Sequence, residues 1–333
     1  MGAADEDVDS LAADSGDEEK LRASAKTVIE TCMQLRSHEN LLVITDPNTA
    51  EIGQVLYEAG SQVSDRVLMV MMPSTHRHGQ EPPAPVADLM RRQHVVIAAT
   101  RYSLTHTRAR LISSKDGARI ATMPGVTRSM FIEGGMTTDF DVLQTQIAGM
   151  ARILRKHRGI SIKNNDGDSL EFTISGRWNL EDNGICNRPG QVTNLPAGKI
   201  FADVKPESVN GVMKINGTWD SISISEPICV IIDEGRVVDI QAPDEGVLNE
   251  QILEFIDENR DSIKMVEFGF GMNPKARISG SALEDEKVLG SCYIVLQQPA
   301  SRRSHEIRAT GILIDPTVML GDYNLIENGK FNE

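Results

Sequence analysis

The histidines are the first candidates for chemistry, because the chain of 333 residues contains only seven of them. His305 lies in the stretch RRSHEIRATG, residues 302–311, whose Val- and Ile-rich flanks predict a strand. An imidazole there can serve as a metal ligand, or as a hydrogen-bonded side chain that contacts a substrate. His76 and His78 have the spacing of metal ligands, but they stand in a loop-like stretch and are interpreted as solvated.

A second group of candidates stands in the stretch SLTHTRAR, where His106 lies between two threonines at a predicted helix start. Thr105 or Thr107 can cap such a helix by accepting a hydrogen bond from a free backbone amide. The alternative is a substrate-binding role, in which Arg108 and Arg110 receive a carboxylate.

The four cysteines are far apart in the chain and form no CxxC pair, which argues against a thiolate zinc site. We interpret them as buried free thiols, as is usual in cytoplasmic proteins. They are Cys32, Cys186, Cys229 and Cys292.

Length and composition predict a soluble protein of two domains, with 40% hydrophobic and 25% charged residues. No apolar run reaches the roughly 18 residues that span a bilayer, and no targeting signal is visible. We therefore expect a cytoplasmic protein without a membrane partner.

The net charge of −14 is concentrated at the N-terminus, where residues 1–20 hold eight acids and one base. Such a stretch repels itself and buries little apolar surface, so residues 1–21 are predicted to form a disordered acidic tail. The alternative is an interaction arm for a basic partner. Nothing in this balance supplies the basic face that nucleic acid requires.

Residues 22–157 are predicted to form a Rossmann-like α/β domain. Near-continuous apolar strands separated by helical patterns are typical of a parallel sheet that is buried on both faces. Neither GxGxxG nor GxxxxGK[ST] occurs, so neither NAD nor ATP is expected. The predicted strands cover residues 40–46, 65–73, 93–100 and 117–125, and the predicted helices cover 23–35, 49–60 and 139–157.

Residues 158–333 are predicted to form a mainly β (α+β) domain, beginning with a hairpin over residues 160–176. Further strand patterns follow, with a helix predicted over residues 249–260. A peptide or small-molecule ligand is expected in the groove between the two domains.

Several stretches, in order, resemble the thermophilic aminopeptidase T family of metallopeptidases and the related 2,5-dihydroxypyridine 5,6-dioxygenase. The resemblance covers roughly residues 25–331 and implies a homodimer. Its motifs are the run over residues 100–131, then GRWNLEDNG, NLPAGKIFADVKPESVNG, VEFGFGMNP, LEDEKVLGSCYIVL and SHEIRATGILIDPTVMLGDYNLIENGKF.

The resemblance also implies a metal site, with two divalent ions in the peptidases and one ferrous ion in the dioxygenase. This chain keeps the expected ligand His305, and it keeps Glu267 as in the peptidases, where the dioxygenase has histidine. Lys199 stands in place of a ligand glutamate and Tyr293 in place of a histidine. Because an ammonium has no lone pair to donate, Lys199 should repel a cation.

The last expected ligand is also changed. Ile307 replaces the aspartate of the family's His-x-Asp, and residues two apart on a strand share a face, so Glu306 could serve only through a bulge. Glu286 is a candidate base or substitute ligand.

Three functions follow from these positions, and they leave open whether the protein is an enzyme. The preferred one is an aminopeptidase T-like protein with an eroded metal site, in which Lys199 pairs with Glu267. It would bind a peptide or small metabolite of a biosynthetic or degradative pathway without divalent-metal catalysis. The first alternative is a metal-dependent aminopeptidase or amide hydrolase using Glu267 and His305, and the second is a non-haem Fe(II) ring-cleaving dioxygenase; the divalent metal would be Zn, Mn, Co or Fe.

Overall fold

The computed structural model describes residues 4–164, 167–220, 222–242, 250, 252, 255, 262–298 and 307–332, with the backbone alone for residues 4–14 and Ile307. Two compact units emerge, one of Met1–Gln144 with Glu181–Ala197 and one of Thr145–Leu180 with Gly198–Glu333. The chain thus leaves the first unit earlier than the boundary predicted near residue 157, and it returns once. Within the described ranges, no helix is long and apolar enough to cross a bilayer.

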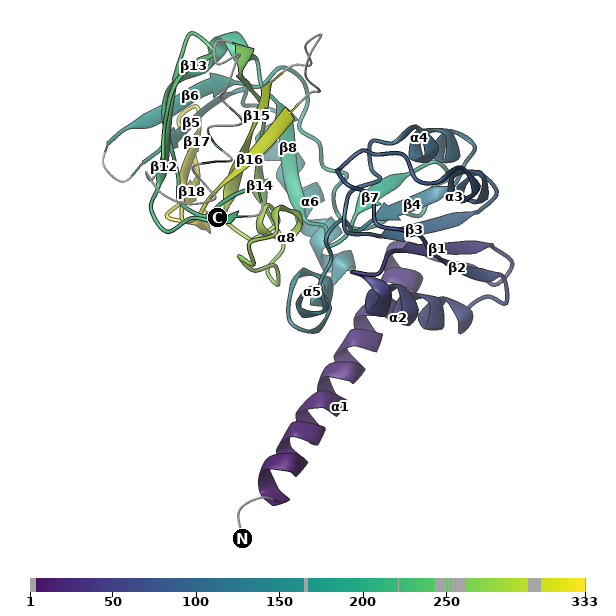
Figure 1. Cartoon of the computed structure of the whole chain (residues 1–333). Coiled ribbons are helices and arrows are strands. Elements are labelled where there is room, and N and C mark those ends of the chain that lie inside the picture. Colours follow the sequence, from purple (N-terminus) through teal and green to yellow (C-terminus); the bar gives the residue numbers. More distant parts are fainter. Residues whose placement is uncertain are drawn as a thin grey trace. The chain divides into compact units, whose positions relative to one another are not determined.

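The first unit contains a five-stranded parallel sheet in the order β2-β1-β3-β4-β7 (Figure 1). Every residue of β1 and β3 is buried, as the apolar runs predicted. The strands are β1 Leu41–Thr45, β2 Val67–Met71, β3 Val95–Ala99, β4 Arg119–Thr122 and β7 Val192–Asn194. The helices are α1 Ala4–Thr27, α2 Ala50–Ser61, α3 Ala84–Met90, α4 Arg108–Lys115 and α5 Arg128–Ile132, while α6 Phe140–Leu154 crosses the division between the units.

Helix α1 overlaps residues 1–21, for which the sequence predicted a disordered tail. Opposite charges one turn apart favour the helix, as in the pair of Lys20 with Asp17 at 3.2 Å. Toward its C-terminus the helix also packs, because Leu21 is fully buried and the Ser24 hydroxyl donates to the Phe131 carbonyl oxygen.

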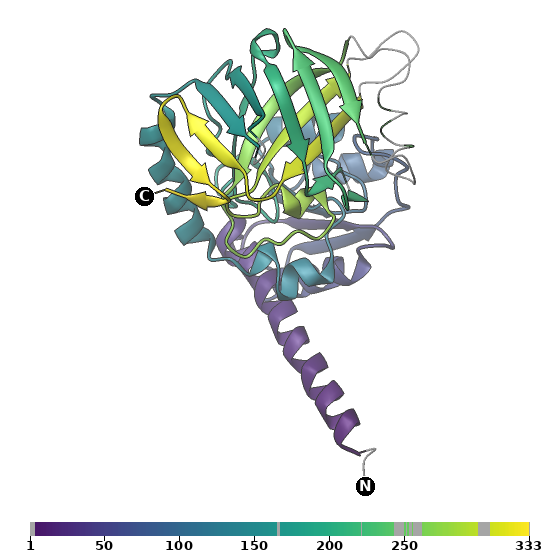
Figure 2. The ribbon, with the colours of Figure 1, turned by 90° about the vertical axis from the view of Figure 1, so that its left-hand side faces the viewer.

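The second unit contains two antiparallel sheets, whose teal, green and yellow strands face the viewer in Figure 2. The hairpin predicted over residues 160–176 is present as β5, Gly159–Lys163, and β6, Ser169–Thr173, while the helix predicted over 249–260 falls mostly outside the described residues. The six-stranded sheet runs β11 Ile222–Ser223, β10 Thr218–Trp219, β16 Ile307–Leu313, β15 Cys292–Gln298, β14 Lys264–Gly271 and β8 Lys199–Asp203. The eight-stranded sheet runs β13 Arg236–Gln241, β12 Ile228–Asp233, β9 Asn210–Ile215, β6 Ser169–Thr173, β5 Gly159–Lys163, β17 Thr317–Leu320, β18 Tyr323–Glu327 and β19 Lys330–Phe331.

The predicted fold class is confirmed: a Rossmann-like parallel sheet with helices, followed by mainly β structure. The cysteines are free thiols, as predicted, and three of them are buried, whereas Cys229 is half-buried.

Candidate functional site

Strand β14 positions the candidate site because its two faces carry different kinds of residue. Side chains alternate along a strand, so Glu267 shares one face with Gly269 and Gly271. Phe268 and Phe270 point to the other face and are fully buried. The stretch EFGFG therefore holds one carboxylate over a surface that is otherwise free of side chains.

That bare surface is filled by Tyr293 of β15, which pairs with Gly269 across the ladder. A Cβ atom on Gly269 would lie 2.6 Å from the Tyr293 hydroxyl oxygen, so only glycine lets the phenol cross the strand. The ring reaches over Gly269, and its hydroxyl donates to Glu267 Oε1 at 2.8 Å.

Lys199, the first residue of β8, brings an ammonium into the same place. Its Nζ donates to Glu286 Oε2 at 2.9 Å and lies 3.8 Å from Glu267 Oε1. The same nitrogen lies 4.7 Å from the ring centroid of Tyr293 and 4.9 Å from that of Phe201. Two carboxylates and two aromatic rings therefore surround this cation.

Glu286 caps the C-terminus of the short helix α8, Ala282–Asp285, and accepts from two lysines. Its second oxygen, Oε1, contacts the Nζ of Lys287, whose side chain is fully buried. Burial by itself would raise the pKa of Glu286, but the charges of Lys199 and Lys287 outweigh it and lower the pKa. Glu286 is therefore an ionised partner of two ammonium groups and a weak proton acceptor.

Arg308 of β16 completes the arrangement, with its Nη2 atom 3.4 Å from Glu267 Oε2. We call these six residues the Lys199 cluster: Lys199, Glu267, Glu286, Lys287, Tyr293 and Arg308. Among the described residues, the cluster has three cationic side chains and two carboxylates. The Lys199, Glu286 and Glu267 side chains are 12%, 13% and 15% exposed, whereas Arg308 is 43% exposed.

The described residues of the Lys199 cluster do not fit a divalent ion. A divalent ion needs anionic oxygen donors, whereas the carboxylates of Glu267 and Glu286 are already paired with two ammonium groups and a guanidinium, whose positive charges would repel it. Within the described part of the chain, no three His, Cys, Asp or Glu side chains gather as a metal site would require. The Lys199 ammonium itself supplies the positive charge between the two carboxylates.

Four residues singled out from the sequence thus lie together: Lys199, Glu267, Glu286 and Tyr293. The ion pair predicted for Lys199 and Glu267 is present at 3.8 Å, although Glu286 is the closer partner. The sequence analysis missed two members of the cluster, Lys287 and Arg308. Lys287 directly follows Glu286, and this neighbour was the available signal.

The remaining predictions at this site concern the start of β16. His305 and Glu306 lie outside the described residues, and Ile307 is described by its backbone alone. Their roles stay predictions.

His106 and Arg108 belong to the first unit, at the start of α4. The capping interpretation is confirmed, because the Thr107 hydroxyl accepts from the backbone N–H of Arg110 at 3.2 Å. The Glu81 carboxylate also accepts from the backbone N–H of Arg108. Carboxylate binding by Arg108 in an interdomain groove stays a prediction.

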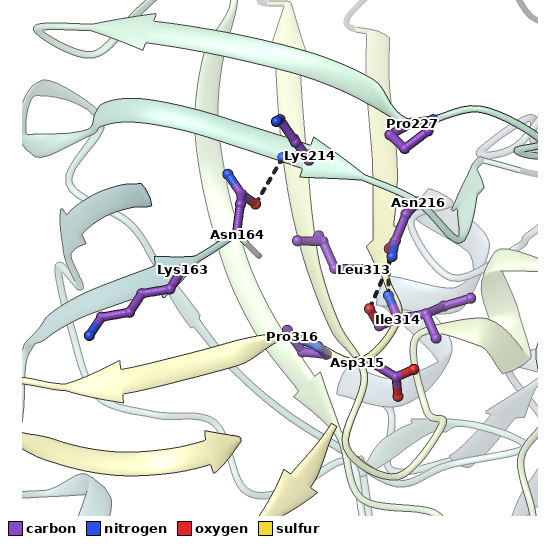
Figure 3. Close-up of a pocket in the computed structure, with 9 residues that line it drawn as sticks. All are labelled: Lys163, Asn164, Lys214, Asn216, Pro227, Leu313, Ile314, Asp315 and Pro316. Atoms are coloured by element: carbon purple, nitrogen blue, oxygen red, sulfur yellow. Dashed lines mark hydrogen bonds between the residues drawn. The ribbon is translucent and has the colours of Figure 1, made fainter. Parts of the chain in front are cut away.

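A cavity of about 320 Å³ in the second unit is a weaker candidate site (Figure 3). The amide of Asn164 bonds the backbone of Val212 and Lys214, and that of Asn216 bonds the backbone of Ile314. Lys163 points away from these groups in Figure 3. The two asparagine amides of this lining therefore serve to hold strands together.

Comparison with solved structures shows the same fold in two proteins. The 2,5-dihydroxypyridine dioxygenase from Pseudomonas putida KT2440 matches with a TM-score of 0.76 and 14% identity, over 94% of this chain and 96% of that chain. Wild-type AmpT from Thermus thermophilus matches with a TM-score of 0.65 and 12% identity, over 94% of this chain and 99% of that chain.

No curated protein matches the chain by sequence. A family model does match, over residues 20–292, and it describes 2,5-dihydroxypyridine 5,6-dioxygenase. Because this match spans most of the chain, the protein belongs to the 2,5-dihydroxypyridine 5,6-dioxygenase family.

Proposed function

We propose that the protein binds a peptide or small metabolite at the Lys199 cluster and works there without divalent-metal catalysis. The observation that carries the proposal is the Lys199 ammonium, 2.9 Å from Glu286 and 3.8 Å from Glu267. Lysine stands at a position where the resemblance places a ligand glutamate. On this proposal, the site keeps the family's fold, and the ammonium of Lys199 takes the place of a bound metal ion.

Charge balance supports this exchange. Two largely buried carboxylates beside each other repel and are costly to ionise, and a bound cation normally offsets that cost. The Lys199 and Lys287 ammonium groups meet the same need from within the chain. A divalent ion entering beside them would face three positive side chains in all.

The exposure of the cluster supports a ligand with polar ends. Arg308 is its most exposed described member, and a guanidinium presents paired donors that suit a carboxylate. Glu267 contacts the same guanidinium at 3.4 Å and holds it at the exposed side of the cluster. A peptide C-terminus or a carboxylate-bearing metabolite carries the group that this guanidinium suits.

The test is cation uptake by protein purified without chelator, measured by elemental analysis after anaerobic addition of Zn²⁺, Mn²⁺, Co²⁺ or Fe²⁺. We expect no stoichiometric ion in the wild-type protein. Lys199→Glu should gain one, because it restores a third carboxylate and removes the tethered cation. Lys214→Glu is the matched control, since Lys214 forms a more exposed pair with Asp168 at 3.7 Å.

One equivalent of metal in the wild-type protein, lost on His305→Ala, would contradict the proposal. It would favour a second candidate, a metal-dependent hydrolase, which draws support from the gathering of Glu267 and Glu286 around one cation. Cleavage of peptides by the loaded protein would then select the hydrolase. Oxygen consumption with hydroxylated aromatic rings would instead select the dioxygenase activity of the family model.

A further inference from the structure

A second and larger cavity, of about 520 Å³, lies in the second unit between the end of α6 and the segment after β6. Its volume falls within the range of pockets that enclose small molecules. We call it the arginine cavity, because Arg155, Arg158 and Arg177 line it together with His157, Trp178 and several apolar residues.

The arginine cavity is strongly cationic in an acidic protein. Three arginines line it, all of them exposed, and no Asp or Glu does among the described residues, although the chain carries a net charge of −14. Arg158 is oriented by a hydrogen bond from its Nη1 to the Gly176 carbonyl oxygen at 2.8 Å. The dipole of α6 accounts for basic residues at its C-terminus, but Arg177 comes from a different segment.

The rest of the lining is apolar and aromatic. The Trp178 indole packs against Phe268 at 6.1 Å and against Phe270 at 5.8 Å between ring centroids. The His157 ring stacks on Tyr323 at 6.1 Å. Within the described part of the chain, the buried Trp178 Nε1–H has no hydrogen-bond acceptor, and an unmet donor of this kind is costly.

We propose that the arginine cavity binds a small organic anion, with a carboxylate or phosphate group held by Arg155, Arg158 and Arg177 and a flat apolar body against Trp178. Guanidinium forks match the planar geometry of both oxyanions, and an indole face suits a ring. This site is separate from the Lys199 cluster, because Phe268 and Phe270 point away from Glu267 on β14.

The experiment is calorimetric titration of the full chain with isophthalate, phenyl phosphate and inorganic phosphate. Isophthalamide is the neutral control, since it keeps the ring and lacks the charge. We expect isophthalate or phenyl phosphate to bind at least tenfold more tightly than inorganic phosphate. The one with the higher affinity identifies the preferred oxyanion as a carboxylate or a phosphate. Their binding should weaken as salt rises, because the contacts are ionic.

Matched variants locate the binding. Arg155→Gln and Arg177→Gln should each weaken it at least tenfold, the loss expected for one charge-assisted contact. Arg152→Gln removes the same charge from the same helix end but lies outside the lining, so it should change affinity less than twofold.

A spectroscopic readout makes the location independent of affinity. The chain has two tryptophans, so Trp219→Phe leaves Trp178 as the reporter, and its fluorescence should change on binding. The proposal would be overturned by no binding of any anion, by equal losses from Arg152→Gln and Arg155→Gln, or by binding that leaves Trp178 fluorescence unchanged. Binding of acidic peptides in preference to both aromatic anions would also overturn it.

Discussion

Replacing Lys199 by methionine should destabilise the second unit by about 3 kcal/mol, because it breaks a largely buried ion pair. Across 2.9 Å, and at an effective dielectric constant of about 20, the attraction between Lys199 and Glu286 is roughly 6 kcal/mol. Desolvation of the two groups offsets about half of that, and Lys287 still balances the other oxygen of Glu286. Methionine keeps the unbranched aliphatic part of the lysine side chain and removes only the ammonium, which lies over the Phe201 and Tyr293 rings.

The assay is a double-mutant cycle with Lys199→Met and Glu286→Gln, followed by calorimetric and urea unfolding at pH 7. A loss of 3 kcal/mol should lower the melting temperature by roughly 6–12 °C. We expect a coupling energy of about 2 kcal/mol between the two sites. Because the pKa of Glu286 is lowered in the fold, its contribution is present at neutral pH and is lost as the pH falls below about 4.5.

The control is the same cycle at Lys214 and Asp168, where the side chains are 29% and 51% exposed and a coupling below about 0.5 kcal/mol is expected. If the Lys199 cycle gave a coupling no larger than this control, the ammonium would be solvated. The reasoning that it balances two largely buried carboxylates would then be refuted.

Three further substitutions test the second unit, each by its free energy of unfolding. Burial raises the pKa of Asp220 to about 6, so its contribution to stability falls as the pH rises from about 4 to 6. Asp220→Asn keeps the acceptor for the Thr310 N–H and should be more stable than the wild type at pH 7.5 by up to about 3 kcal/mol, with no difference near pH 4. Gly269→Ala should cost about 2–3 kcal/mol, because the added Cβ would lie 2.5 Å from the Tyr293 ring, whereas Gly149→Ala on α6 meets no atom and should be neutral or stabilising. Tyr293→Phe removes the hydroxyl donated to a carboxylate and should cost about 1–2 kcal/mol; a change below about 0.3 kcal/mol would show that this hydrogen bond adds nothing.

The sequence predicted the elements whose hydrophobic patterns are strong. The continuous apolar runs of β1 and β3 are buried on both faces, and that pattern is legible without a structure. Strand β7 was not predicted, because three residues, Val192–Asn194, are too short to show a period. Its place beside β4 depends on pairing between distant segments, which local sequence patterns do not reveal.

The candidate site was predicted only in part, because local sequence patterns do not show which distant residues come into contact. The family resemblance picked out Lys199, Glu267 and Tyr293 by their places in motifs, and the sheet brings them together. Arg308 was missed because its contact with Glu267 depends on how β16 pairs with β15 and β15 with β14. The position of Lys287 depends on the turn after α8, which a single sequence does not specify.

The return of residues Glu181–Ala197 to the first unit affects how this chain can be made and cut. During synthesis, β4 cannot pair with its neighbour β7 until about seventy intervening residues have emerged, including the first hairpin of the other unit. No single proteolytic cut can release either unit whole, since the backbone passes between them three times. A fragment that keeps the second unit whole, with the Lys199 cluster in it, must therefore join Leu180 to Gly198 through an engineered linker.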